Sequence, residues 1–387
     1  MDISYSKEHE EYREKVRHWL LDNIPESNNG RYTYQQRLDW EKVLFNGGYS
    51  ATTWPPEYNG QGKDQVFQVI FNEESARLNS PRGANFVGKV IVGPTLLEFG
   101  TESQKNRYLS KIASGEENWC QCFSEPNAGS DLASLRTKAE YKNGKWIING
   151  QKIWASNAKF ADYGILLART DSDAPKHKGI TLFILPMNTE GITINSLKQM
   201  SGEEDSFSEV FFDDVVLEGD CVVGGVNNGW NVAMRAFSYE RGGDTIEKAA
   251  AFHQELLDLI EISGELESKN DRTIKSSSYF RQNIAKMYTE VMVLKYLGLK
   301  SVNKLINNEK ITTESSVNKL YWSEYHKRFG ELAMEVLGCE SPYWGEEDVK
   351  WGAFHHIFIK SRSETIYAGT SQIQKNIIAE RILGMER

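Results

Sequence analysis

Cysteine is scarce in this chain of 387 residues, and the four cysteines do not form a disulfide framework. Cys120, Cys122, Cys221 and Cys339 are too few and too scattered to staple a secreted fold. We therefore expect reduced thiols and a cytoplasmic location. Cys120 and Cys122 would place both thiols on one face of a strand, but no second cysteine pair or nearby histidine accompanies them. A metal site is therefore not predicted.

The chain also lacks a long apolar run and an excess of positive charge. No segment approaches the roughly 18 apolar residues of a transmembrane helix. The first ten residues, MDISYSKEHE, are too charged for a secretory signal. The net charge of −9, without basic clusters, argues against a nucleic-acid partner, because phosphate contacts need lysine and arginine. The composition thus argues against a membrane-spanning protein and a general nucleic-acid binder.

Hydrophobic residues make up 40% of the sequence, which is ample for a large core in a chain longer than one average domain. Their spacing is helical in residues 1–117, strand-like in residues 118–225 and helical again in residues 226–387. Asn143-Gly144 is a strong hairpin signal, and Asn149-Gly150 predicts a second turn. The sequence predicts an α+β multi-domain protein with an N-terminal α-helical domain, a middle antiparallel β-barrel or sheet domain and a C-terminal four-helix bundle.

The expected elements follow from these periodicities and from the breakers between them. In the N-terminal domain we expect a helix around 12–20, others over 38–45 and 64–78, and a capping box at 101–104 that opens a further helix. The predicted strands cover 119–123, 137–141, 145–149, 164–169, 180–185 and 209–216. The predicted bundle helices cover 230–262, 277–306, 317–337 and 370–383, and the polar segment 265–278 is predicted to be a loop.

The sequence CFSEPNAGSDL at residues 122–132 is the first candidate functional segment. A β-compatible run ends at Ser124, and Pro126 followed by Gly129 predicts a tight turn whose backbone amides can converge on a planar or anionic group. Ser124 and Ser130 add short polar side chains to the same turn. Taken alone, the segment could equally be a polar turn between two strands.

Four segments together resemble the acyl-CoA dehydrogenase family over essentially the whole chain. They are FSEPNAGSD at 123–131, NGQKIWAS at 149–156, EVFFDDVV at 209–216 followed by NGW at 228–230, and IYAGTSQIQ at 366–374. The resemblance implies FAD as cofactor and α,β-desaturation of an acyl-CoA thioester, as in lipid metabolism and fatty acid β-oxidation. It also implies that electrons leave through an electron-transfer flavoprotein. The ending IIAERILG at 377–384 resembles the bacterial branch that includes steroid side-chain enzymes.

The resemblance also implies which residues bind the cofactor and the substrate. The implied cofactor-binding residues are Gln121, Phe123, Ser124, Gly129, Ser130, Trp154, Ala155, Ser156, Gly369, Thr370 and Gln372. Trp154 would cover the flavin ring and Ser156 would lie near its reactive nitrogen, although a core aromatic is the plainer alternative for Trp154. The implied substrate contacts are Ser130, Tyr239, Arg241 and Ala368, with the Ala368 amide donating to the thioester carbonyl. The plainer alternative for Thr370 is a helix cap.

The catalytic base stands at a less common position. Many family members carry it as the Glu of a Tyr-Glu-Gly-Thr motif, but this chain has Ala368 there. Other branches carry it before an Arg on the first bundle helix, and here Glu240-Arg241 stands at that place. We therefore predict that Glu240 removes the α proton while hydride passes from the β carbon to flavin N5. Such a base needs a dry cleft that raises its pKa; the alternative is a solvated helical charge pair.

Two departures from the family pattern concern the neighbouring subunit. The Arg-x-x-Phe-Gly run that often reaches a neighbour's FAD is missing from 265–279, where Arg272 is a weak substitute. The Gly-Gly after the third bundle helix is altered to Leu-Gly-Cys at 337–339. The protein is then either a homo-oligomer, dimer or tetramer, or one subunit of a hetero-oligomer whose partner supplies those contacts. Two alternative functions stay open: partner subunit of a heteromeric dehydrogenase, and flavin-dependent oxidase or monooxygenase on the same scaffold.

Overall fold

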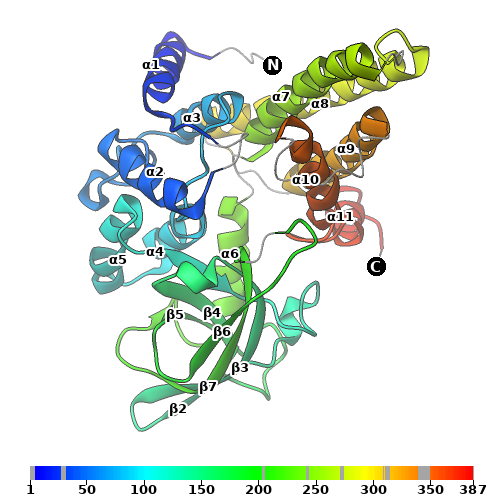
Figure 1. Cartoon of the computed structure of the whole chain (residues 1–387). Coiled ribbons are helices and arrows are strands. Elements are labelled where there is room, and N and C mark those ends of the chain that lie inside the picture. The colour runs from blue at the N-terminus through cyan, green and yellow to red at the C-terminus, as the bar shows by residue number, and fades with distance from the viewer. Residues whose placement is uncertain are drawn as a thin grey trace. The chain divides into compact units, whose positions relative to one another are not determined.

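The computed structural model describes residues 5–27, 32–202, 205–240, 244–270, 274–307, 309, 314–338 and 349–386. In these residues the strands lie between two helical regions of the sequence, as predicted (Figure 1). The chain divides into two compact units, which are described separately below. The sheet unit comprises residues 33–63 and 82–240, and the helical unit comprises residues 1–32, 64–81 and 241–387.

The sheet unit begins with helices and ends with one. They are α2 (Tyr34–Asn46), the short 3-10 helix η1 (Pro56–Tyr58), the π-helix η2 (Gly88–Val92), α4 (Gly93–Phe99), α5 (Glu102–Ser114) and α6 (Gly229–Glu240). The predicted capping box of α5 is confirmed, because the Thr101 hydroxyl accepts from the Gln104 amide while the Gln104 side chain accepts from the Thr101 amide. Pro94 has no N–H to give to the preceding turn, and the helix there widens to π spacing.

A single mixed sheet fills the rest of this unit. Its strands are β1 (Trp119–Cys122), β2 (Lys138–Lys142), β3 (Lys145–Ser156), β4 (Tyr163–Arg169), β5 (Ile180–Pro186), β6 (Ile192–Ser196), β7 (Phe207–Leu217) and β8 (Val222–Val223). The order is β6-β7-β3-β2-β4-β5-β8, with β1 beside β4. Most pairs are antiparallel, as predicted, but β1 and β2 both run parallel to β4. The predicted hairpin joins β2 to β3, with φ of 52° at Asn143 and 80° at Gly144.

The turn predicted at Asn149-Gly150 is wrong, because β3 runs through both residues to Ser156. The pairing of β3 with β7 shifts register between Ile148 and Gly150. Gly150 has φ of 147°, and a Cβ placed there would stand 2.7 Å from the Cα of Thr137. The glycine therefore permits a β-bulge and a close approach of two strands, rather than a chain reversal.

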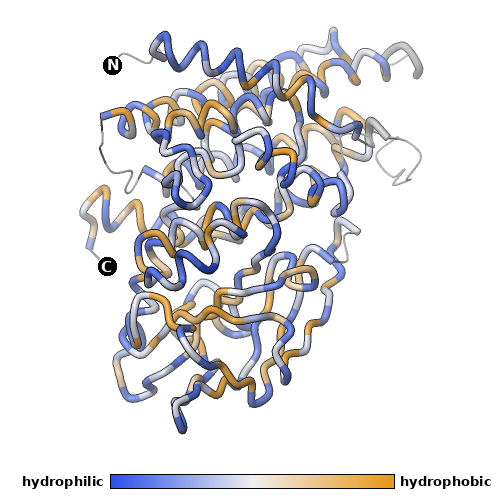
Figure 2. The backbone as a smooth tube through the Cα atoms, turned by 90° about the vertical axis from the view of Figure 1, so that its left-hand side faces the viewer, coloured by the Kyte–Doolittle hydropathy of each residue, from blue (hydrophilic) through white to orange (hydrophobic). Residues whose placement is uncertain are grey.

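The helical unit is built from helices along which hydrophilic and hydrophobic residues alternate (Figure 2). They are α1 (Lys7–Asn23), α3 (Gln65–Arg77), α7 (Asp244–Asn270), α8 (Ser278–Ile306), α9 (Glu314–Leu337), α10 (Val349–Glu364), α11 (Ser371–Ile377) and the π-helical η6 (Ile378–Ile382). Helices α7 to α10 share a core that includes Leu256, Leu294, Phe329 and Phe354. Among the described helices, none is both long enough and apolar enough to cross a membrane.

Two expectations for the C-terminal helices need correction. The predicted helix 230–262 is described as α6, which ends at Glu240, and α7, which begins at Asp244; the junction lies outside the described residues. The predicted loop 265–278 is wrong over its first part, because α7 continues to Asn270. Helix α10 was missing from the predicted four-helix bundle. Its Phe354 and Ile357 share a buried face, but the polar Ser361 and Glu364 are also buried, so the helix shows no clear apolar stripe in the sequence.

Candidate active site

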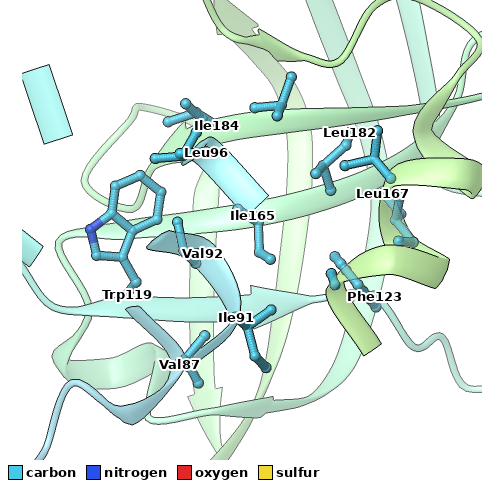
Figure 3. Packing of buried hydrophobic residues seen from close by; sticks show 14 of the residues in the cluster. Val87, Ile91, Val92, Leu96, Trp119, Phe123, Ile165, Leu167, Leu182 and Ile184 are labelled. Carbon is cyan, nitrogen blue, oxygen red and sulfur yellow. The ribbon is translucent and has the colours of Figure 1, made fainter. Parts of the chain in front are cut away.

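The candidate loop at 123–131 starts from a fixed point in the core of the sheet unit. The side chains of Trp119 and Phe123, at the start of β1 and just after its end, are buried among apolar residues of η2, α4, β4 and β5 (Figure 3). The Phe123 ring also meets Phe237 of α6 edge to face, with ring centroids 5.7 Å apart. The loop therefore begins beside α6, whose last residue is Glu240.

The loop itself is the tight turn that the sequence predicts. The amide of Glu125 donates to the carbonyl of Ala128 at 3.1 Å, and the amide of Ala128 donates back at 3.0 Å. Gly129 and Ser130 follow and are exposed. A Cβ added to Gly129 would meet no atom within 4 Å, so this side of the turn is open. The turn thus presents its glycine and serine to whatever binds here.

A buried ion pair, which the sequence analysis missed, ties this loop to β3. The Lys152 ammonium lies 2.8 Å from the Glu125 carboxylate and donates at 3.0 Å to the carbonyl of Phe123. Glu125 also accepts from the amides of Arg136 and Thr137, at 2.7 and 2.8 Å. Lys152 is 0% exposed and Glu125 8%. The available signal was a lysine at an inward position of a strand that otherwise buries apolar residues.

The two charges of this pair support each other. Burial raises the pKa of Glu125, but the Lys152 ammonium and the hydrogen bonds to the carboxylate outweigh it and hold that pKa below its usual value. Burial lowers the pKa of the Lys152 ammonium, and the Glu125 carboxylate opposes this shift. Because removing one partner would leave the other charge buried and unpaired, the loop and the strand are held together as one piece.

Trp154 is exposed on a strained backbone next to this pair. Its φ is 62°, in the left-handed region that bulky residues avoid, and its side chain is 57% exposed. The pairing of β3 with β7 shifts register between Lys152 and Ala155, so a bulge turns the indole outward. The amide of Ile153 donates to the carbonyl of Ser124 at 2.9 Å, which places the loop against the bulge. The alternative of a core aromatic at Trp154 is therefore wrong.

The other predicted residues of this segment differ in exposure. Ala155 is buried and Ser156 is half-buried. Gln121 lies on β1, and its side-chain nitrogen is buried without a hydrogen-bond partner among the described residues. A buried donor that lacks an acceptor costs about 1–3 kcal/mol. The Gln121 amide is therefore suited to donate to a bound molecule.

The end of α6 is held by a charged contact. Arg235 binds the Glu98 carboxylate with two nitrogens, at 3.0 and 2.7 Å, and the Tyr239 hydroxyl donates to the same carboxylate. Burial, with Glu98 next, raises the pKa of Tyr239 to about 12, so the phenol remains a donor at neutral pH. Tyr239, predicted to contact the substrate, thus already gives its hydroxyl to Glu98. Arg241 lies outside the described residues, as do Arg272 and Cys339.

The predicted site residues 368–372 belong to the helical unit. Ala368 and Gly369 have φ of 52° and 91°, so two successive residues take left-handed conformations. Gln374 of α11 donates to the Ala368 carbonyl at 3.0 Å, and its side-chain oxygen is buried with no partner among the described residues. The Thr370 hydroxyl accepts from the Ile373 amide at 3.1 Å, so its plainer role as a helix cap is confirmed. Gln372 is exposed.

The three thiols in the described part of the chain offer no reactive site. Cys120, Cys122 and Cys221 are free and buried, and the first two sulfur atoms lie 3.8 Å apart. Contact with the Cys122 thiol and burial raise the pKa of Cys120 well above its usual value, so this thiol stays protonated. In the described part of the chain, no group of three or more histidine, cysteine or acidic residues is arranged to hold a metal ion.

Comparisons with known proteins match the whole chain. Three family models match: acyl-CoA dehydrogenase N-terminal domain at residues 6–116, middle domain at 120–215 and C-terminal domain at 227–383. Acyl-CoA dehydrogenase IpdE1 of Mycobacterium tuberculosis is 35% identical over 388 residues, which cover 98% of each chain. A solved structure of the Tcur3481-Tcur3483 steroid ACAD has a TM-score of 0.88 at 29% identity, and the ChsE4-ChsE5 complex of Mycobacterium tuberculosis has 0.85 at 27%; each match covers 100% of both chains.

Proposed function

The chain belongs to the acyl-CoA dehydrogenase family and is an FAD-dependent oxidoreductase, and we propose that it desaturates an acyl-CoA between its α and β carbons with Glu240 as the base. The observation that carries this assignment is the strained, exposed Trp154 beside a loop locked by the Glu125–Lys152 pair. Strain of this kind persists only where the surrounding structure enforces it, and it gathers at functional sites.

The residues around Trp154 fit a flavin. FAD, when bound, supplies the two-electron oxidant. The exposed indole offers a flat apolar face, and the open side of Gly129 lets a ring approach the backbone. The unpartnered Gln121 amide and the half-buried Ser156 offer hydrogen bonds to polar ring atoms. In this proposal Phe123, Ser124, Ser130 and Ala155 line the same site, and Gly369, Thr370 and Gln372 also bind the cofactor.

Proton removal is assigned to Glu240. Ala368 replaces the carboxylate that many family members carry at its position, so the reaction needs a base elsewhere. Glu240 ends α6, the helix whose Phe237 packs on Phe123 at the start of the loop. The Arg235–Glu98–Tyr239 contact holds the last turn of that helix, which supports a fixed backbone where Glu240 stands.

The substrate carbonyl needs hydrogen-bond donors, because negative charge develops on its oxygen as the α proton leaves. We assign this role to the backbone amide of Ala368, which does not depend on the side chain at that position. The left-handed conformations of Ala368 and Gly369, held by Gln374, support a pre-set orientation for that turn. Ser130, Tyr239 and Arg241 complete the proposed substrate contacts.

The electron acceptor and the setting are further parts of the proposal. An electron-transfer flavoprotein would take the electrons, as the family resemblance implies. The free thiols of Cys120, Cys122 and Cys221 support a reducing compartment such as the cytoplasm. A bulky, steroid-like acyl group is supported by the name of the Tcur3481-Tcur3483 steroid ACAD, which this chain resembles at 29% identity.

A second candidate is that the chain works as one subunit of a heteromeric dehydrogenase. Two of the similar solved structures carry paired names, Tcur3481-Tcur3483 and the ChsE4-ChsE5 complex. The sequence lacks the Arg-x-x-Phe-Gly run at 265–279, which in other members reaches the neighbouring subunit's cofactor. Both observations support a partner chain that supplies those contacts; a homodimer or homotetramer is the alternative.

One experiment tests the function and separates the two candidates. The protein is purified alone, its absorbance spectrum is recorded, and it is titrated without oxygen with straight-chain, branched and steroid-type acyl-CoAs. Yellow protein that is bleached by an acyl-CoA and reoxidises slowly in air supports the dehydrogenase. Colourless protein that acquires FAD only with a second chain supports the heteromer. Yellow protein that no acyl-CoA in the panel bleaches would contradict the proposed reaction.

A further inference from the structure

A histidine in the helical unit lies between two carboxylates. His326 of α9 is 4% exposed; its Nδ1 is 2.5 Å from Oε2 of Glu364 and its Nε2 is 3.1 Å from Oε2 of Glu255. Glu364 is the last residue of α10 and Glu255 lies on α7, so the imidazole joins three helices. The ring of Phe252 stacks on it, with centroids 4.2 Å apart and planes 23° apart. Nothing in the proposed reaction uses this group directly.

The two partners fix the charge of the imidazole. A neutral imidazole has one N–H, whereas two ionised carboxylates offer acceptors to both ring nitrogens. The doubly protonated ring satisfies both contacts, and His326 is therefore an imidazolium at neutral pH. Burial opposes this charge, but the carboxylates of Glu255 and Glu364 outweigh it and raise the pKa of His326 to about 9.

Other charged groups face this cluster from the surrounding helices. Lys248 of α7 and Lys360 of α10 act with His326 to hold the pKa of Glu364 below its usual value, against the effect of burial. Glu290 of α8 pairs with Arg328 of α9 at 2.6 Å, which keeps that carboxylate engaged with a different cation. Among the described residues, the cation in direct hydrogen-bond contact with the Glu364 carboxylate is His326.

Glu364 stands where the turn that carries Ala368 begins. The amide of Ser371 donates to the carbonyl of Thr365 at 3.0 Å, which closes a loop over residues 365–371. At the far end of that loop, the Ser371 hydroxyl donates to Glu324 at 2.6 Å. Glu324 and His326 both belong to α9, so this helix holds the loop through Glu364 at one end and Ser371 at the other.

We propose that His326 is a positioning residue for the reaction, and that its imidazolium, by holding Glu364, sets the position of the Ala368 amide. This inference rests on the proposed role of that amide as a donor to the substrate carbonyl. The loop needs an external hold because Ala368 and Gly369 are both in left-handed conformations, which cost of order 1–3 kcal/mol for a non-glycine residue. Loss of the imidazolium frees the α10 end, while Glu324 still holds the α11 end. The amide then moves off its place by a shift that a rate measurement detects.

The test compares His326→Gln and Glu364→Gln with two controls in the full-length protein loaded with FAD. Glu331→Gln removes the solvent-exposed Arg362–Glu331 contact, which also joins α9 to α10. Leu332→Ala destabilises α9 through its core face without touching the loop. The readouts are hydrogen-exchange protection of residues 365–371, corrected for the intrinsic rate at each pH, and kcat and KM for the acyl-CoA that bleaches the flavin.

At pH 7.5 we expect His326→Gln and Glu364→Gln, the two cluster variants, to lose hydrogen-exchange protection in residues 365–371. We also expect kcat to fall about 10- to 100-fold while KM changes less than twofold, because a displaced donor weakens the transition state more than substrate binding. In the unmodified protein the same protection falls as pH rises through about 9, and His326→Gln removes that step. Both controls should keep wild-type protection at pH 7.5 and keep the step near pH 9, because His326 is intact in each. Wild-type protection in both cluster variants, or an equal loss in Leu332→Ala, overturns the inference. Hydrogen exchange is measured without substrate and therefore tests the hold on the loop by itself. If no acyl-CoA is oxidised, the proposed function fails, and the exchange result still decides whether His326 positions the loop.

Discussion

The ammonium of Lys152 lies 2.8 Å from the carboxylate of Glu125, and this buried contact locks the loop at 123–131 to the bulge of β3. Glu125 belongs to the loop, whereas Lys152 stands two residues before the exposed Trp154. The pair therefore fixes the relative position of two segments that the proposal assigns to the flavin. An apolar pair at the same two positions would stabilise the fold as well, but it would make no hydrogen bonds to fix the position of the loop.

Replacement of Lys152 by methionine should break this lock. Glu125 would remain buried without its cation, at a cost of about 3–5 kcal/mol in the free energy of unfolding. We also expect the purified variant to lose most of its FAD, because the loop and the bulge would no longer share one geometry. Urea unfolding and the ratio of flavin to protein absorbance measure the two effects.

A surface lysine provides the matched control for this change. Lys142 pairs with Glu140 at 2.6 Å but is 59% exposed, so Lys142→Gln should leave both stability and FAD content essentially unchanged. The double variant Lys152→Met with Glu125→Gln should regain part of the lost stability, since it leaves no unpaired charge. Equal losses in the single and double variants would show that the ion pair does not act as described.

The sequence predicted the α–β–α order because each region has its own hydrophobic period, and local signals such as Asn143-Gly144 and the capping box at Thr101 were confirmed. The prediction at Asn149-Gly150 was wrong because the same dipeptide can form a turn or a bulge. Only the partner strand decides between them, and that partner, β7, is distant in sequence. Helix α10 was missed because its buried residues include the polar Ser361 and Glu364 beside Phe354 and Ile357, which obscures the apolar stripe.

The candidate site could be predicted only where its residues lie in short motifs. The loop at 123–131 and Trp154 belong to such motifs, but the exposure and strain of Trp154 depend on a bulge that no local pattern reveals. Glu125 and Lys152 are 27 residues apart, and their contact follows from the fold alone. The roles of the site residues, Glu240 above all, stay predictions until they are tested.

Replacement of Trp154 by glycine should separate stability from cofactor binding. Glycine adopts a φ near 62° without strain, so the substitution should relieve about 1–2 kcal/mol of backbone strain and remove little packing, because the indole is mostly exposed. We expect the FAD-free variant to unfold at an equal or higher urea concentration than the parent protein, while FAD binds at least tenfold more weakly. Urea unfolding of the FAD-free proteins and fluorescence titration with FAD measure these effects.

Asn143→Gly is the control for this change, since Asn143 also has a positive φ, of 52°, but stands in the β2–β3 hairpin. It should leave FAD affinity unaltered. Unchanged FAD affinity in Trp154→Gly would remove Trp154 from the cofactor site.

The stability of the helical unit should fall in mildly alkaline solution. His326 has a pKa of about 9 in the folded protein against an ordinary 6.5, so its protonation stabilises the folded state in full below pH 6.5. That contribution, about 3 kcal/mol for a shift of this size, is lost as pH rises through 9. Urea unfolding from pH 6 to 10 should show the decrease in the parent protein and a flatter profile in His326→Gln. Parallel profiles for the two proteins would contradict an imidazolium at this position.

The contact of Tyr239 with Glu98 should matter for rate more than for binding. Tyr239→Phe removes the donor to Glu98 but keeps the ring, and Arg235 still binds that carboxylate. The last turn of α6 would then be held less firmly just before Glu240. We expect flavin reduction by acyl-CoA to slow by about tenfold, with FAD content unchanged. Stopped-flow absorbance measures the rate, and Tyr141→Phe, an exposed tyrosine on β2, serves as the control.

Replacement of Glu240 by glutamine tests the base itself. Glutamine has nearly the same shape but cannot accept the α proton, so FAD content and acyl-CoA binding should be retained while flavin reduction falls by at least 10³-fold. The measurement is anaerobic stopped-flow absorbance with the acyl-CoA that bleaches the parent protein. Glu261→Gln, on an exposed position of α7, is the control for the same chemical change and should reduce its flavin at the parent rate. Since Ala368 offers no carboxylate, a Glu240→Gln variant that keeps the parent rate would mean that the proton leaves to another group, and the assignment of α6 as the catalytic helix would then be wrong.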